Sequence, residues 1–370
     1  MKEVFKMKGN NKYYDVWDDE DDGLPRIVSV AEFLGNPSKL PEEVIESVVR
    51  QGHKMMISGA SKSGKSFLLI ELAIALAEGT KWLGFQCRKS KVMYINLEID
   101  RNSLIHRFMD IYVSLGIKPK NAHCISIWNL RGSSKPLDEL IPELIQKATL
   151  QGAEVIILDP IYKVMMGDEN NATDMANLTN LFDKICYETG CTFVYSHHHS
   201  KGAQGFKKSM DRASGSGVFA RDADPQVDMI QLETSDEFMV QYADVKTSSA
   251  WRLESSLREF PNFKPVNFWF EYPIHRVDDK GILAKHYANG DPKANLDKSS
   301  KKNQTIESRK DEFDAAFGNE SAGTGSCALT DLMSYLGIAE RTVRKRLSEF
   351  SDEYVCSKGR VMKVQKAPAE

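Results

Sequence analysis

The chain has 370 residues, of which 41% are hydrophobic and 27% charged, so it can bury a full core and form two domains or one large domain with additions. Its net charge of −3 excludes polyanion binding by bulk charge, so any nucleic-acid surface must be local. The sequence contains no apolar run of membrane-spanning length, no signal-peptide core, and no disulfide-like or C-x-x-C spacing among its six cysteines, which predicts a reduced, cytoplasmic protein.

The chain begins with an acidic segment. Residues 1–25 contain YYDVWDDEDDG, a run that predicts a solvated, mobile arm. A contact role for Tyr13, Tyr14 and Trp17 is the alternative.

Strand-like runs alternate with helical ones from about residue 27 to 287. The strand candidates are KMMIS, KVMYINLE, HCISIW, EVIILDP, CTFVYSHH, VDMIQLE and FMVQYADVK. Helical patterns fall between several of them, which favours a mostly parallel α/β sheet flanked by helices. We therefore predict one α/β domain over residues 26–287.

A glycine- and serine-rich stretch stands between a strand and a helix pattern. Residues 57–66 read ISGASKSGKS, and Gly59 to Ser66 has the form G-x-x-x-x-G-K-S. In a phosphate loop of this form, backbone N–H groups surround phosphates, Lys65 reaches the β- and γ-phosphates, and the Ser66 hydroxyl binds Mg²⁺. A flexible loop with a chance match is the alternative. We predict ATP binding by Gly59, Ala60, Ser61, Lys62, Ser63, Gly64, Lys65, Ser66 and Phe67.

Two acidic residues follow strand candidates. VMYINLE ends in Glu98, and a carboxylate at the end of a strand beside the phosphate loop can orient and deprotonate an attacking water. VIILDP contains Asp159, of the type and position expected for an acidic Mg²⁺ partner. The alternatives are a helix cap near Asp100 for Glu98 and a turn residue before Pro160 for Asp159. The ordered set of loop, Glu98 and Asp159 favours the catalytic interpretation.

The next strand candidate, CTFVYSHHHSKG, ends in three histidines. Polar residues at the carboxyl edge of a parallel sheet face the ligand crevice, where a histidine can sense the γ-phosphate. A zinc site is excluded, since adjacent histidines of a strand point to opposite faces and no cysteine lies at a zinc-like spacing. At least one of His197, His198 and His199 is expected to pack beneath the next loop.

The ordered motifs resemble the RecA-like ATPases, and more closely the hexameric RepA-type branch, over about residues 25–255. On this resemblance GASKSGKS is the phosphate loop, Glu98 the catalytic glutamate, Asp159 the magnesium aspartate and His198 the sensor histidine. GDENNATDM is similar to a RepA-type stretch around Asp-Glu-Asn. RASGSGVFARDAD looks like the family's Arg-Gly-Ser segment, except that Ala213 intervenes. The resemblance implies Mg²⁺-dependent ATP hydrolysis by a homo-hexamer.

The resemblance also implies a channel for single-stranded DNA. In RecA-like rings two loops line the channel, and here they correspond to Lys163–Asp174 and Ser200–Gly217. The second loop is rich in Gly and Lys, and its cations can follow a phosphate backbone. These cations are Lys201, Lys207, Lys208 and Arg212. An ordinary solvated loop is the alternative.

Catalysis by such ATPases often needs a cation from the neighbouring subunit. YADVKTSSAWRLE places Lys246 and Arg252 at the end of a late strand and just beyond it, so they are the candidates for this role. Simple surface charges are the alternative.

A small C-terminal domain follows a polar linker. Residues 288–304 lack an apolar period and predict the linker. Residues 305–370 contain three helical patterns, IESRKDEFDAAF, ALTDLMSYLG and AERTVRKRLSEF, and then a hairpin, YVCSKGRVMKV, that turns at Lys358–Gly359. This order resembles a winged helix, with Gly337 in the turn of a helix-turn-helix.

Basic residues follow the third helical pattern. Arg341, Arg344 and Arg346 are expected on or beside its outward face, where they could bind duplex DNA. A protein-docking winged helix is the alternative.

These observations predict a ring-forming, Mg²⁺-dependent ATPase that acts on DNA, foremost a replicative helicase of a plasmid or mobile element. A RecA-like recombination or loading ATPase that does not unwind DNA is one alternative. An ATP-gated DNA-binding regulator that uses the winged helix is the other.

Overall fold

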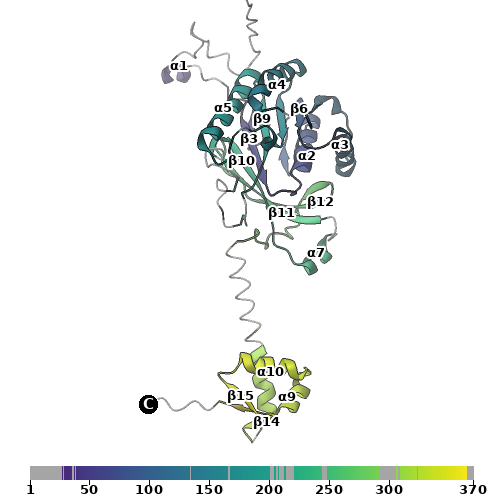
Figure 1. Cartoon of the computed structure of the whole chain (residues 1–370), viewed down its shortest axis with the longest axis vertical. Helices are drawn as coiled ribbons and strands as arrows, with labels where there is room; N and C mark the ends of the chain where they lie inside the picture. Colours follow the sequence, from purple (N-terminus) through teal and green to yellow (C-terminus); the bar gives the residue numbers. More distant parts are fainter. Residues whose placement is uncertain are drawn as a thin grey trace, which may run out of the picture. The chain divides into compact units, whose positions relative to one another are not determined.

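The computed structural model describes residues 27–364 apart from 28, 36, 38, 134, 166, 201–203, 206, 208–211, 214–220, 244–247, 292–305, 307–308 and 323. The chain forms two compact units, Met1–Asp291 and Pro292–Glu370, and each is described by itself (Figure 1). All of the predicted acidic arm, and residues 292–304 of the predicted linker, lie outside the described residues.

Nine described strands form the main sheet of the first unit, in the order β13-β12-β11-β10-β3-β9-β8-β6-β7. Neighbours from β7 to β10 run parallel, and those from β10 to β13 run antiparallel. The strands are β3 Lys54–Gly59, β6 Val92–Asn96, β7 Ile125–Asn129, β8 Val155–Asp159, β9 Thr192–His198, β10 Pro225–Gln231, β11 Ser248–Leu257, β12 Val266–Glu271 and β13 Ile274–Val277. The predicted mostly parallel α/β fold is confirmed.

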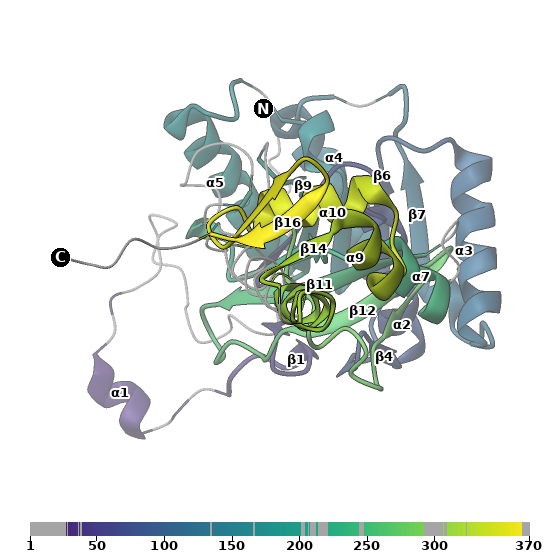
Figure 2. The same cartoon turned by 90° about the horizontal axis from the view of Figure 1, so that it is seen from below.

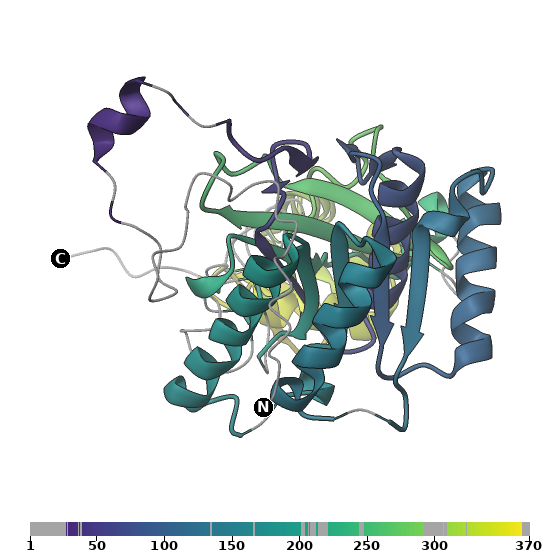
Figure 3. The same cartoon turned by 90° about the horizontal axis from the view of Figure 1, so that it is seen from above.

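Helices cover both faces of this sheet (Figures 2 and 3). One face carries α2 Lys65–Glu78 and α3 Arg101–Leu115, and the other α4 Leu137–Gln151 and α5 Ala172–Thr189. Because successive strand residues point to opposite faces, Met55 and Ile57 join the core under α2 and α3, whereas Met56 joins the core under α4 and α5. β3 is therefore apolar on both faces, as parallel strands between helix layers usually are.

Smaller elements complete the first unit. They are α1 Val30–Gly35, the pairs β1 Glu43–Ile45 with β2 Val49–Arg50 and β4 Lys81–Trp82 with β5 Phe85–Gln86, the 3-10 helices η1 Ala122–Cys124 and η2 Ile161–Lys163, and α7 Asp236–Tyr242. No described helix is both long and apolar enough to cross a membrane.

The strand predicted for FMVQYADVK is wrong, because its first half belongs to helix α7. The Ser235 side chain accepts a hydrogen bond from the N–H of Phe238, so the chain enters a helix despite its β-prone residues. Arg252 accordingly lies inside β11 rather than just beyond a late strand.

The second unit has a hydrophobic core of its own. A helix over residues 309–320, α9 Leu329–Leu336 and α10 Glu340–Glu349 pack with a three-stranded sheet of order β14-β16-β15, formed by Ser326–Ala328, Arg360–Lys363 and Tyr354–Ser357. Leu332 and Val343 are fully buried in it. The hairpin turns at Lys358 and Gly359, both with positive φ, as the sequence predicts, whereas β14 was not predicted.

Candidate active site

Residues 59–66 join the carboxyl end of β3 to α2, which is the setting that the phosphate-loop motif requires. Gly64 precedes the helix in a left-handed conformation, with φ of 89°, and no described side chain caps the helix. The first-turn N–H groups of α2 and the helix dipole therefore suit this end to an anion such as a phosphate.

Lys65 begins α2, and its side chain folds back over the loop. Its Nζ donates to the carbonyl oxygens of Gly59 at 2.8 Å and Ala60 at 2.7 Å. Burial lowers the pKa of Lys65 to about 8, although the charges of Asp159 and Glu98 act in the opposite direction. Phosphate oxygens are thus well suited to replace these carbonyl groups as partners of the ammonium.

Asp159 ends β8 and is buried, with 3% of its surface exposed. One carboxylate oxygen accepts from Ser196 Oγ at 2.6 Å and the other from Tyr94 OH at 3.0 Å. This burial and these bonds are not those of an exposed turn residue before Pro160. A carboxylate here and the Ser66 hydroxyl are hard oxygen donors, the kind that Mg²⁺ prefers.

Glu98 is exposed and lies two residues beyond the end of β6. Its Oε1 accepts from Tyr162 OH at 3.2 Å. The helix cap is Asp100, which accepts from the N–H of Ser103 at 2.9 Å, so capping does not account for Glu98. The position also differs from the prediction, because β8 and β9 separate β6 from the phosphate-loop strand.

A cavity of about 370 Å³ brings Glu98 and the loop together. Its lining consists of Ser66, Glu98, Ile99, Asp100, Ser103, Arg107 and Arg131. Neither arginine was predicted from the sequence. The Arg107 guanidinium lies over the ring of Phe67, 4.6 Å from its centre, and Arg131 lies 3.9 Å from the Asp100 carboxylate. Arg107 could have been noticed nine residues after Glu98 on the next helix, whereas nothing local in the sequence marks Arg131.

The three histidines at the end of β9 have different surroundings. His198 Nδ1 lies 3.4 Å from Lys65 Nζ and 3.5 Å from Ser61 Oγ, and burial together with the Lys65 charge lowers the His198 pKa. His197 is buried, and His199 Nε2 lies 3.0 Å from Ser58 Oγ. His198 is therefore the histidine beside the loop, and the other two pack inside, as expected for at least one of them.

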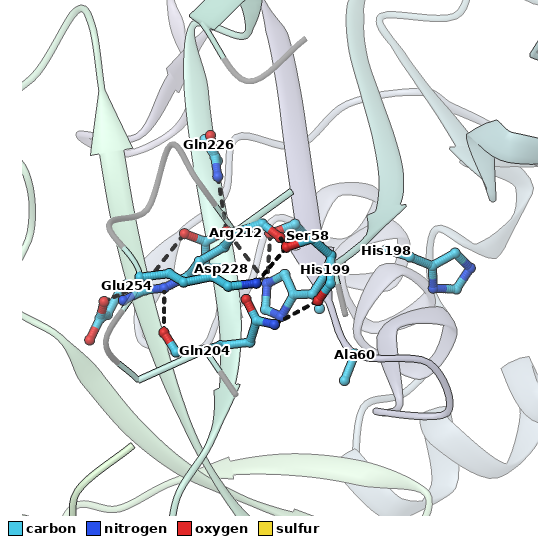
Figure 4. A network of polar contacts seen from close by, with 12 residues as sticks. Ser58, Ala60, His198, His199, Gln204, Arg212, Gln226, Asp228 and Glu254 are labelled. Carbon is cyan, nitrogen blue, oxygen red and sulfur yellow. Dashed lines mark hydrogen bonds and ion pairs between the residues drawn. The ribbon is translucent and has the colours of Figure 1, made fainter. Parts of the chain in front are cut away.

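Arg212 is buried in a polar network that includes Ser58 of β3, the strand that precedes the phosphate loop (Figure 4). Its Nη1 lies 2.6 Å from Glu254 Oε2 and 3.4 Å from Asp228 Oδ2, and its Nε donates to the Gln204 carbonyl at 3.3 Å. Asp228, which is fully buried, also accepts a hydrogen bond from Ser58 Oγ. The guanidinium is thus held inside the sheet by two carboxylates, and not at the surface where it was expected to follow a DNA backbone.

The other predicted channel and subunit-interface cations are only partly described. Lys201, Lys208 and Lys246 lie outside the described residues. The Lys207 ammonium donates to Ser200 Oγ at 2.7 Å. Arg252 donates from Nε to Asn267 Oδ1 and from Nη2 to the His286 carbonyl, both at 2.9 Å, so its guanidinium is bonded within its own chain.

The cations of α10 differ in their exposure. Arg341 is exposed, and Arg344 is exposed beside Glu340, with an ion pair of 2.8 Å across one helical turn. Arg346 has a side chain only 13% exposed and pairs with Glu312 of the helix at 309–320 at 2.8 Å. The expected outward position of Arg346 is therefore wrong.

The first unit is similar to parts of several known proteins. Residues 23–204 match the model of a family described as AAA domain. A KaiC-like protein from the hyperthermophilic archaeon Pyrococcus horikoshii OT3 is 13% identical, with a TM-score of 0.42, over 63% of this chain and 93% of that one. The ATPase domain of a second protein of known structure is 12% identical, with a TM-score of 0.43, over 59% and 81% of the two chains. The part of the chain that is similar to an AAA domain thus contains the loop, Glu98, Asp159 and the three histidines.

Proposed function

We propose that the chain is a Mg²⁺-dependent ATP hydrolase that acts on DNA in the cytoplasm, as a ring-forming replicative helicase of the RepA type from a plasmid or mobile element. The observation that carries this proposal is the convergence of Lys65, Ser66, Asp159, Glu98 and His198 around one loop. Each contributes a group that phosphoryl transfer needs, and most of that chemistry is positioning and charge stabilisation.

The roles follow from the contacts. The first-turn N–H groups of α2 and the Lys65 ammonium would hold the β- and γ-phosphates. Ser66 and Asp159 would hold Mg²⁺, which would neutralise phosphate charge. Glu98 orients the attacking water and takes its proton. His198, beside Lys65, meets the γ-phosphate. Arg107, in the same cavity as Glu98, offsets charge that develops during transfer.

The second unit supplies the contact with duplex DNA. Its order of helix, β14, α9, α10 and the β15–β16 hairpin is the basis for proposing a winged helix. Exposed Arg341 and Arg344 lie on the last helix, the position from which a helix-turn-helix reads the major groove. These two side chains also favour a second candidate, an ATP-gated DNA-binding regulator.

Unwinding of a forked duplex separates the candidates. The full-length chain with ATP and Mg²⁺ is expected to separate the strands, and a Glu98→Gln variant should bind the fork without separating it. Sequence-specific duplex binding without unwinding would favour the regulator. ATP turnover on single strands with neither activity would favour a recombination or loading ATPase.

A further inference from the structure

A buried acid–imidazole pair lies beside the phosphate loop. Neither of its two residues has a role in the proposed chemistry. Glu71 belongs to α2 and His275 to β13, 204 positions apart in the chain. The His275 side chain is 0% exposed and that of Glu71 6% exposed. Burial of two ionisable groups costs desolvation free energy, so we expect this pair to have a role besides packing.

Glu71 fixes the orientation of the imidazole. Its Oε1 accepts from the backbone N–H of His275 at 3.1 Å and lies 2.6 Å from the Nδ1 of the same residue. Since this oxygen already accepts one N–H, Nδ1 is the donor in the second bond, which leaves Nε2 on the opposite side of the ring. The ring of Phe270 stacks on the imidazole, with centres 4.6 Å apart and planes 28° apart.

The far edge of this imidazole faces the turn that begins α2. A Cβ placed on Gly64 would lie 3.3 Å from His275 Nε2 and 3.5 Å from two ring carbons of Phe270. In the described structure Nε2 has no hydrogen-bond partner. Gly64 and Glu71 are seven positions apart, about two helical turns, and therefore share one face of the first part of the helix. His275 therefore bonds Glu71 at one end of that stretch and faces Gly64 at the other.

We propose that the Glu71–His275 pair positions the phosphate loop, by holding the Gly64 turn against the first two turns of α2 so that Lys65 and Ser66 meet the nucleotide in register. His275 and Glu71 are positioning residues, and neither touches the phosphates. The inference rests on the proposed ATP site. A displaced loop weakens ground-state and transition-state binding alike, so it raises KM and leaves kcat nearly unchanged.

Two substitutions at His275 distinguish the effect of its bond to Glu71 from the effect of the atom that faces Gly64. Asparagine places an amide near the Nδ1 position, so His275→Asn keeps a donor for Glu71 and withdraws the atom beside Gly64. His275→Gln reaches farther and refills that space. We expect His275→Asn to raise the Kd of a Mg²⁺-bound, non-hydrolysable ATP analogue and the KM for ATP about tenfold, with kcat changed less than twofold, and His275→Gln to recover to within about threefold of the parent.

Loss of core stability alone must be distinguished from this effect. Phe182→Leu, in the core under the opposite face of the sheet, is the matched control. It should lower Tm and leave Kd unchanged. A folded His275→Asn variant with the Kd and KM of the parent would overturn the proposal. Should that variant not fold, Glu71→Met decides, because it removes the acceptor of both bonds from His275 at similar volume, and an unchanged Kd there would also overturn the proposal. Failure of the parent chain to bind the analogue would overturn the ATPase proposal as well.

Discussion

At the scale of one residue, the lowered pKa of Lys65 predicts that nucleotide binding is linked to proton uptake. Its pKa is lowered to about 8, so the amine is charged below that pH and neutral above it. Bound phosphates favour the ammonium and raise the pKa, so nucleotide binding should take up about half a proton near pH 8, and affinity should fall as pH rises further. Calorimetry in buffers of different ionisation enthalpy measures the uptake. Binding without proton uptake at pH 8 would contradict the assignment. Lys65→Ala should abolish the uptake and lose most affinity at pH values where the parent lysine is charged.

A substitution at Glu98 should distinguish ATP binding from ATP hydrolysis. Glu98→Gln keeps the size of the side chain and its bond to Tyr162, but it cannot accept a proton from water. The variant should bind ATP normally and hydrolyse it about 10²–10⁴ times more slowly. Single-turnover hydrolysis and analogue binding are the measurements. Asp100→Asn is the control on the same turn, and nearly normal turnover in Glu98→Gln would remove the residue from the mechanism.

At the scale of elements, the polar network of Figure 4 connects the segment between β9 and β10 to three strands of the main sheet. Arg212 links that segment to Asp228 of β10 and Glu254 of β11, and Asp228 in turn bonds Ser58 of β3. Arg212→Met would remove the cation from two carboxylates, so we expect a loss of about 3–5 kcal/mol in the free energy of unfolding. Urea denaturation measures it. Lys207→Met, on the same segment, should change stability by less than about 1 kcal/mol, and equal effects of the two would contradict the anchoring role.

The elements show why some features were predictable and others were not. The phosphate loop and Asp159 follow from a few consecutive residues, because strand, turn and helix are encoded locally there. The helix α7 was missed because the Ser235 side chain, which accepts a hydrogen bond from the N–H of Phe238, caps a helix despite the β-prone side chains after it. Contacts between distant segments leave no local pattern. The pairing of Glu71 with His275 and the burial of Arg212 depend on the antiparallel strands β11 to β13, whose order no single stretch reveals.

The second unit carries a prediction for the whole molecule. Replacing Arg341 and Arg344 together by alanine in the full chain should reduce the dependence of duplex affinity on salt by about two units in the log–log slope, because two phosphate contacts are lost. Fluorescence anisotropy over a salt series measures the slope. Lys264→Ala with Lys280→Ala removes two exposed cations from the first unit and should leave the slope unchanged. An unchanged slope in the arginine variant would favour protein docking.

The strand order of the main sheet determines which residues an independently folding fragment with the phosphate loop must include. The family match ends at residue 204, yet β3 lies between β9 and β10, and β10 begins only at Pro225. A fragment cut at residue 204 would turn β3 into an edge strand, with open backbone groups and apolar side chains on both faces. Such an edge recruits other chains, so the fragment should precipitate. Removal of β10 would thus disturb the strand that precedes the phosphate loop, although every residue of the loop itself would remain in the fragment.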